Sequence, residues 1–71
     1  MKIYIVLRNS DTIELKGRDY IKKIFNTKEK ALNYIKEETG KEPEYRHTFD
    51  WADSITERYE YAYSIQIYTV Y

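Results

Sequence analysis

Few residues in this 71-residue chain have types and spacings that could carry out chemistry. His47 is the only histidine, and it lies between Arg46 and Thr48 in a segment that alternates like a strand. A hydrolytic triad would need a serine nucleophile placed by its own local motif, and the sequence offers none. A structural role for His47 is therefore the favoured interpretation.

Asp50, Asp53 and Glu57 are the carboxylates whose spacing comes closest to a divalent-cation site. A calcium loop also needs a glycine at its sharp turn and a bidentate glutamate at a fixed distance, and both are missing. Aspartates that bond their own backbone in a turn are the commoner explanation. Because the chain also lacks cysteine and a glycine-rich phosphate loop, the sequence predicts no cofactor, no metal site and no enzymatic activity.

Charge is divided unevenly along a chain whose net charge is zero. Residues 1–36 hold nine Lys and Arg against four Asp and Glu, whereas residues 37–71 hold three against eight. Attraction between the two halves inside the fold is the favoured interpretation, and an acidic binding surface is the alternative.

The elements that must position these residues begin with a strand at residues 2–8. Alternation places Ile3, Ile5 and Leu7 on one face, and the other face receives Tyr4, Val6 and Arg8. A second strand is predicted at residues 12–16, at residues 20–25, or at both with a kink at residue 17.

The segment FNTKEKALNYIKEETG predicts a helix over residues 27–39. Asn26 is expected at the N-cap with Glu29 completing a capping box, and Gly40 is expected to end the helix in a left-handed conformation. Apolar side chains at helical spacing should form its buried face: Ala31, Leu32 and Ile35, with Tyr34 at the border.

The chain returns to an extended pattern at residues 44–49, and its last stretch, ERYEYAYSIQIYTVY, alternates almost without interruption. Unbroken, residues 58–71 would span roughly 45 Å, against a diameter of roughly 30 Å for a compact domain of this size. The strand must therefore bend at a bulge near residues 62–64, or its first part must project with the preceding strand as a two-stranded arm. Tyr63, Ile65 and Ile67 are expected in the core, whereas Tyr59 and Tyr61 are expected to be free for binding.

These elements predict a single α+β domain over residues 1–71 with the order ββαββ. An antiparallel sheet of about four strands would carry one helix packed on one face. One helix cannot cover both faces, so the other face must meet water or a partner. If the first and last strands are neighbours, Tyr4, Val6, Tyr68 and Val70 would form a patch on that uncovered face.

The succession of KIYIVLR, then IFNTKEKALNYIKE, then a tyrosine-rich strand resembles a group of small ββαβ proteins of bacteria and their phages. In that group an Asn/Ser-Thr-Lys-Glu-Lys-Ala segment starts the helix, and the resemblance covers roughly residues 1–40. No activity is assigned to the group. The resemblance therefore implies a strand pair leading into a helix, and it implies no site residues.

Surfaces remain as the candidate sites. Tyrosine is a favoured anchor in protein interfaces, and here it is mixed with acidic residues, so the sequence predicts a non-enzymatic protein-binding module. Its expected partner is a larger protein with a basic surface, for example a nuclease. The residues expected to bind this partner are Asp50, Trp51, Asp53, Glu57, Tyr59, Glu60 and Tyr61. The concrete hypothesis is a phage or mobile-element inhibitor of a host defence protein, of the anti-CRISPR type, that acts by surface occlusion.

Two other kinds of partner stay open. A second copy of the chain could use the same arm in a homodimer. Single-stranded nucleic acid could stack on aromatic side chains of the uncovered sheet face, but carboxylates near the tyrosine-rich strand would repel phosphates, so this is the alternative hypothesis. No membrane partner is expected, since no stretch is long enough to cross a bilayer, and the lack of cysteine fits the cytosol.

Overall fold

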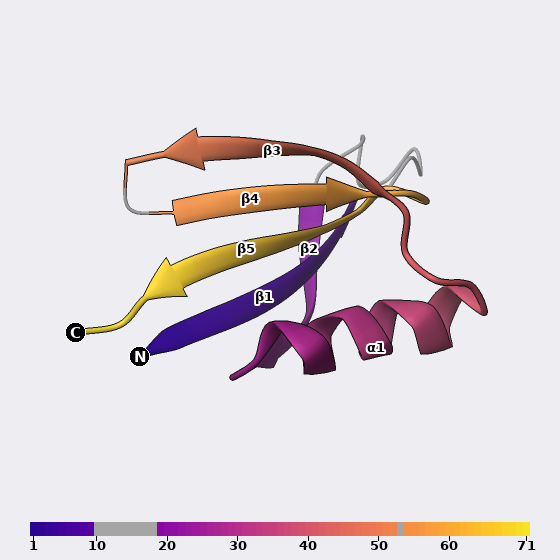
Figure 1. The fold of residues 1–71 in the computed structure, drawn as a ribbon, viewed down its shortest axis with the longest axis horizontal. Coiled ribbons are helices and arrows are strands. Elements are labelled where there is room, and N and C mark those ends of the chain that lie inside the picture. Colours follow the sequence, from indigo (N-terminus) through magenta and orange to yellow (C-terminus); the bar gives the residue numbers. More distant parts are fainter. Residues whose placement is uncertain (10–18, 53) are drawn as a thin grey trace.

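The structure, a computed structural model, describes residues 1–9, 19–52 and 54–71. Within them six elements follow one another (Figure 1): β1 (Lys2–Asn9), β2 (Asp19–Phe25), α1 (Lys28–Thr39), β3 (Tyr45–Trp51), β4 (Ser54–Tyr59) and β5 (Tyr63–Thr69). All strand pairs are antiparallel, and the five strands lie in the order β2-β1-β5-β4-β3. The predicted α+β architecture is confirmed, with the order ββαβββ instead of ββαββ.

The second strand lies at the later of its two predicted positions, and the earlier one, residues 12–16, is outside the described residues. The helix begins and ends close to its predicted limits, but its N-cap is Thr27 and not Asn26. The Thr27 hydroxyl accepts a hydrogen bond from the backbone N–H of Lys30 at 3.2 Å. Position N3 is therefore a lysine, so the expected capping box with Glu29 does not form. Gly40 ends the helix with φ of 76°, as predicted.

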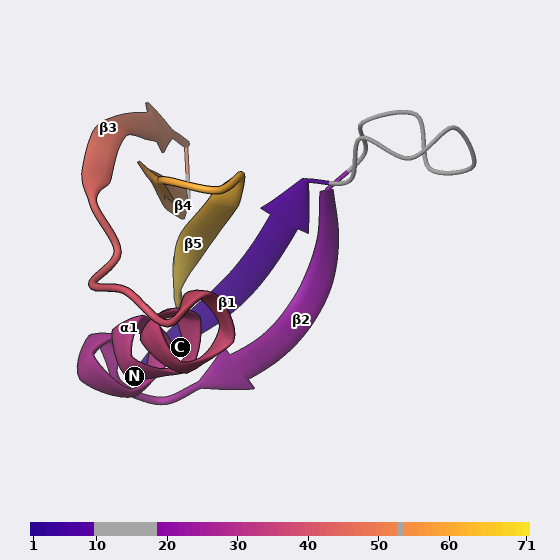
Figure 2. The same ribbon diagram turned by 90° about the vertical axis from the view of Figure 1, so that its right-hand side faces the viewer.

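The helix α1 lies on one side of the sheet, against β1 and β2 (Figure 2). Its buried residues Ala31 and Ile35 pack with Val6 of β1 and Ile65 of β5, and each of these four side chains is exposed by 1 % or less. Tyr59 and Tyr63 complete this core, with exposures of 7 % and 6 %. Burial of Val6, Ile35 and Ile65 contributes about 1.5–3 kcal/mol of stability for each side chain.

The side of β1 that faces the helix is the one that the sequence analysis placed on the uncovered face. Strands β1 and β5 are neighbours, as expected, and their register pairs Val6 with Ile65 and Tyr4 with Ile67. Because Val6 and Ile65 are in the core and Tyr4 and Ile67 pack against it, this set faces the helix. The expected open patch of Tyr4 and Val6 with Tyr68 is therefore wrong, and of these three only Tyr68 lies on the far side.

The last fifteen residues form a hairpin and not one long strand. Residues 60–62 make a tight turn in which Tyr61 and Ala62 have φ of 60° and 63°, and the Tyr63 N–H donates to the Glu60 carbonyl at 3.3 Å. Positive φ at both central residues is the signature of a type I′ hairpin turn. The predicted break near residue 62 is thus present as a complete reversal, and β4 pairs with β5 instead of projecting as an arm.

Ion pairs join the basic and acidic halves of the sequence. Lys28 contacts Glu57 at 2.7 Å, Lys36 contacts Glu42 at 2.7 Å, and Lys22 contacts Glu38 at 3.7 Å. Each pair links a cation from residues 1–36 to a carboxylate from residues 37–71. The interpretation that the two halves attract each other inside the fold is confirmed.

Candidate protein-binding surface

No described helix packs on the side of the sheet away from α1. We call this side the open face. Strand register assigns to it the following side chains: Ile3, Ile5 and Leu7 of β1, Ile21 and Ile24 of β2, His47 and Phe49 of β3, Ser54, Thr56 and Arg58 of β4, and Ser64, Gln66 and Tyr68 of β5. Its two ends differ in chemistry.

The β1–β2 end of the open face is aliphatic. Ile24 lies opposite Ile5 and Ile21 lies opposite Leu7 in the register of the two strands. Ile21 and Ile24 are 60 % and 52 % exposed, whereas Ile3 and Ile5 are half-buried, and Leu7 is buried together with its cross-strand neighbour Ser64. A bulge opposite Val6 and Leu7 inserts one residue into β2, so two isoleucines spaced by three share one face. That spacing is why the alternation pattern did not identify them.

The β3–β4 end of the open face carries aromatic rings and a cation. The rings of His47 and Phe49 meet edge to face with centroids 4.5 Å apart, and the Arg58 guanidinium lies 5.6 Å from the centroid of the Phe49 ring. Both arrangements are favourable contacts of aromatic rings.

The acidic residues expected to meet a basic partner have partners within the chain. Glu57 lies on the helix side of β4, where Lys28 approaches both of its oxygens at 2.7 and 2.9 Å. Tyr59 Oη donates a hydrogen bond to Glu57 Oε1 at 3.3 Å. Burial, followed by the nearby Glu57 carboxylate, raises the pKa of Tyr59 to about 12. Tyr59 is a core residue, so the expectation that it is free for binding is wrong.

Glu60 directly follows β4 and is the first residue of the turn that leads into β5. The Arg46 guanidinium donates to Glu60 Oε1 at 3.1 Å, and a hydrogen bond with the Glu44 carboxyl group raises the pKa of Glu60. Tyr61, next to it in the turn, is 51 % exposed. Both residues stand apart from the β3–β4 connection, where Asp50 is located.

Asp50 is exposed near the end of β3, on the helix side of the sheet. Trp51 ends the same strand, and Asp53 lies outside the described residues. The structure thus brings Glu57 and Tyr59 together in one polar contact, and Asp50 lies on the same side of the neighbouring strand β3. The role of these residues in binding a partner stays a prediction.

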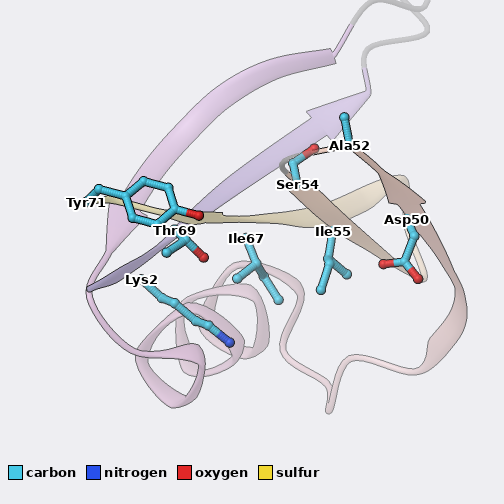
Figure 3. Close-up of a pocket in the computed structure, with 8 residues that line it drawn as sticks. All are labelled: Lys2, Asp50, Ala52, Ser54, Ile55, Ile67, Thr69 and Tyr71. Atoms are coloured by element: carbon cyan, nitrogen blue, oxygen red, sulfur yellow. The ribbon is translucent and has the colours of Figure 1, made fainter.

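A hollow of about 390 Å³ lies on the helix side of the sheet, beside the ends of β3 and β5. Figure 3 shows Ile55 and Ile67 side by side in it, with Lys2 and Asp50 on opposite sides. Lys2 and Asp50 are both exposed to solvent. The hollow therefore combines an apolar pair, Ile55 and Ile67, with two exposed side chains of opposite charge.

Among the residues that the structure describes, no group of three or more His, Asp or Glu side chains is placed to hold a metal ion. No helix in the described ranges is long and apolar enough to span a membrane. Comparison with protein-family models, with curated proteins and with solved structures finds no match. The candidate site therefore rests on the geometry of the chain itself.

Proposed function

We propose that this chain is a small non-enzymatic protein-binding module, an inhibitor from a phage or other mobile element that acts by surface occlusion. Its target would be a larger host defence protein, such as a nuclease, as in anti-CRISPR inhibition. The observation that carries the proposal is the open face, where Ile21 and Ile24 expose more than half of their surfaces. Exposed apolar clusters of this kind mark interaction sites.

The size of the open face supports a specific contact. Five strands spaced by about 4.8 Å and roughly seven residues long cover about 500 Å² in projection. A specific interface takes about 600–1,000 Å² of accessible surface from each partner. The projected area of the open face, in whose middle Leu7 and Ser64 are buried, approaches the lower end of that range.

The chemistry of the open face selects the partner surface. Its aliphatic end fits an apolar patch on the partner, because the centre of a protein interface is depleted of charged residues. The basic partner surface expected from the sequence is replaced in this proposal by an apolar one, because Glu57 and Glu60 already have cationic partners inside the chain.

A pair of variants tests the proposal. Ile21→Glu with Ile24→Glu places charges on the open face, and Ile55→Glu is the matched control, since Ile55 is an exposed isoleucine on the opposite face. One host protein should be captured by the wild type and by the control, and its activity should fall when either is added. The double variant should bind that purified protein at least about tenfold more weakly. A target that is bound equally by all three forms would refute the open face as the site.

One observation favours the alternative function, binding of single-stranded nucleic acid. His47, Phe49 and Tyr68 are aromatic side chains on the same face as Arg58, which is the arrangement on which unpaired bases stack. Binding of a labelled oligothymidine that weakens steeply between low and high salt, and that Phe49→Ala and Tyr68→Ala abolish, would support this function. The inhibitor hypothesis expects no such binding.

A further inference from the structure

Strand β3 is an edge strand of the sheet, and β2 is the edge strand at the other end. Among the described strands, β3 has only β4 as a neighbour. Every side chain from Tyr45 to Asp50 is exposed. In an antiparallel ladder, alternate residues direct their backbone N–H and C=O groups toward the same neighbour. Trp51 pairs with Ser54 across a two-residue connection, so the groups of Thr48 and Asp50 point away from β4.

The sequence of β3 is symmetrical in chemistry about its central residue, Thr48. One step to either side are the aromatic rings of His47 and Phe49, and two steps to either side are the opposite charges of Arg46 and Asp50. Two antiparallel copies of this strand centred on Thr48 therefore pair ring with ring and cation with carboxylate. Each of these cross-strand pairs is stabilising, and each would occur twice.

We propose that β3 pairs with β3 of a second copy of this chain, antiparallel and about a two-fold axis at Thr48, so that the two sheets become one continuous sheet. The backbone groups of Thr48 and Asp50 would then gain partners, as in strand addition to a free sheet edge. This contact uses neither Ile21 nor Ile24. It is independent of the proposed function, and it leaves the open face of both copies available.

The charges of Arg46 and Asp50 indicate that the strand pairing with the free edge of β3 comes from a second copy of this chain. Arg46 and Asp50 are four residues apart, about 13 Å along one strand, which is too far for an ion pair within the chain. Asp50 has no ion pair among the described residues, and the Arg46 side chain is 58 % exposed beside Glu60. Arg46 is the extra residue of a bulge, and its long side chain can reach past the bulge to Asp50 of the second copy. Two-fold pairing brings together the two charges that one chain keeps apart.

The other edge strand of the sheet, β2, is less suited to pairing with a second copy. Strand β2 contains a bulge and carries Lys22 and Lys23 in its middle, and both features hinder pairing of a free edge. In β3 the bulge is near the start, and residues 47–51 keep a regular register with β4. The edge that remains suited to pairing is therefore that of β3.

Sedimentation equilibrium of the full chain, from micromolar to millimolar concentration, tests the proposal. The wild type should form a dimer. Arg46→Asp and Asp50→Arg should each weaken it by about tenfold or more, because every ion pair becomes a like-charge contact. The double variant, which exchanges the two charges, should restore the dissociation constant to within about threefold of the wild type.

Two controls separate this contact from effects within one chain. Glu60→Gln removes the intramolecular partner of Arg46 and should leave the dimer intact. Lys30→Asp reverses an exposed charge on α1 and should also leave it intact. A monomer at every concentration would overturn the proposal. So would a dimer that both single reversals leave unchanged, or a double variant that fails to restore association.

Discussion

Lys28 in the first turn of α1 and Glu57 in β4 form an ion pair of 2.7 Å, although 29 positions separate them in the sequence. The main contacts of the helix with the sheet are to β1 and β2, so this pair also connects α1 to β4. The Glu57 side chain is 16 % exposed, and it accepts a further hydrogen bond from Tyr59. The pair therefore links the helix to β4, a strand that its main contacts do not reach.

Replacing Lys28 with methionine should lower the free energy of unfolding by about 1 kcal/mol, because Glu57 then loses its cation while the apolar stem is kept. The Lys28 side chain is 42 % exposed, so solvent screening limits the effect to this size. Urea denaturation measures it, and high salt should reduce the difference between variant and wild type. Lys30→Met, an exposed neighbour, is the control and should change stability by less than about 0.5 kcal/mol. Equal losses in the two variants would show that the ion pair contributes nothing specific.

The helix could be predicted from the sequence because its signals are local. Ala31, Leu32 and Ile35 follow the helical period, and Gly40 supplies the left-handed residue that ends it. The N-cap was misplaced by one position because Asn26 and Thr27 are both good capping residues. Such an error changes the hydrogen bond at the helix start and leaves the buried face unchanged.

The faces of the strands could not be predicted in the same way, because both alternating sets of β1 are apolar. Whether Ile5 or Val6 faces the helix depends on the register with β5, which lies about sixty residues later in the chain. The hairpin at residues 60–62 was hidden for a related reason. Its central residues are Tyr61 and Ala62, and neither is one of the glycine or asparagine residues that normally signal such a turn.

The candidate site was only partly predictable. The division of charge between the two halves predicted internal ion pairs, but it could not show that Glu57 would be used in one. The alternation of tyrosines treated Tyr59 and Tyr61 alike, whereas the turn places Tyr59 in the core and exposes Tyr61. An uncovered face was expected from the presence of a single helix. Its composition depended on the bulge in β2, which no local pattern revealed.

Three of the nine tyrosines should ionise late in an alkaline titration, and one of them is Tyr63, whose pKa is raised by burial. A hydrogen bond from Tyr34 Oη to Glu38, 2.7 Å long, raises the pKa of Tyr34 to about 12. Burial beside Glu57 raises the pKa of Tyr59 to about 12. A tyrosine whose folded-state pKa is raised keeps its full contribution to stability below the unfolded pKa of about 10, and loses it as the pH rises through the folded pKa. The free energy of unfolding should therefore fall between about pH 10 and pH 12.

Tyr34→Phe and Tyr59→Phe should each remove one late transition from the ultraviolet absorbance of the phenolates, and each should make the alkaline loss of stability less steep. Tyr71→Phe removes a fully exposed tyrosine at the chain end, and it should leave the late transitions in place. If neither Tyr34→Phe nor Tyr59→Phe alters the late part of the titration, the two contacts with Glu38 and Glu57 do not exist in solution.

The turn between β4 and β5 should be improved by glycine. Ala62 has φ of 63° in the left-handed region, where a side chain costs about 1 kcal/mol relative to glycine, and it is exposed. Ala62→Gly should therefore raise the free energy of unfolding by about 0.5–1 kcal/mol, less the entropy that glycine adds to the unfolded chain. Glu37→Gly on the exposed surface of α1 is the control of opposite sign and should lower it by about 1 kcal/mol. Chemical denaturation of both variants measures these changes. A loss of stability in Ala62→Gly would mean that residues 60–62 do not form this turn, and that the last fifteen residues pair in another way.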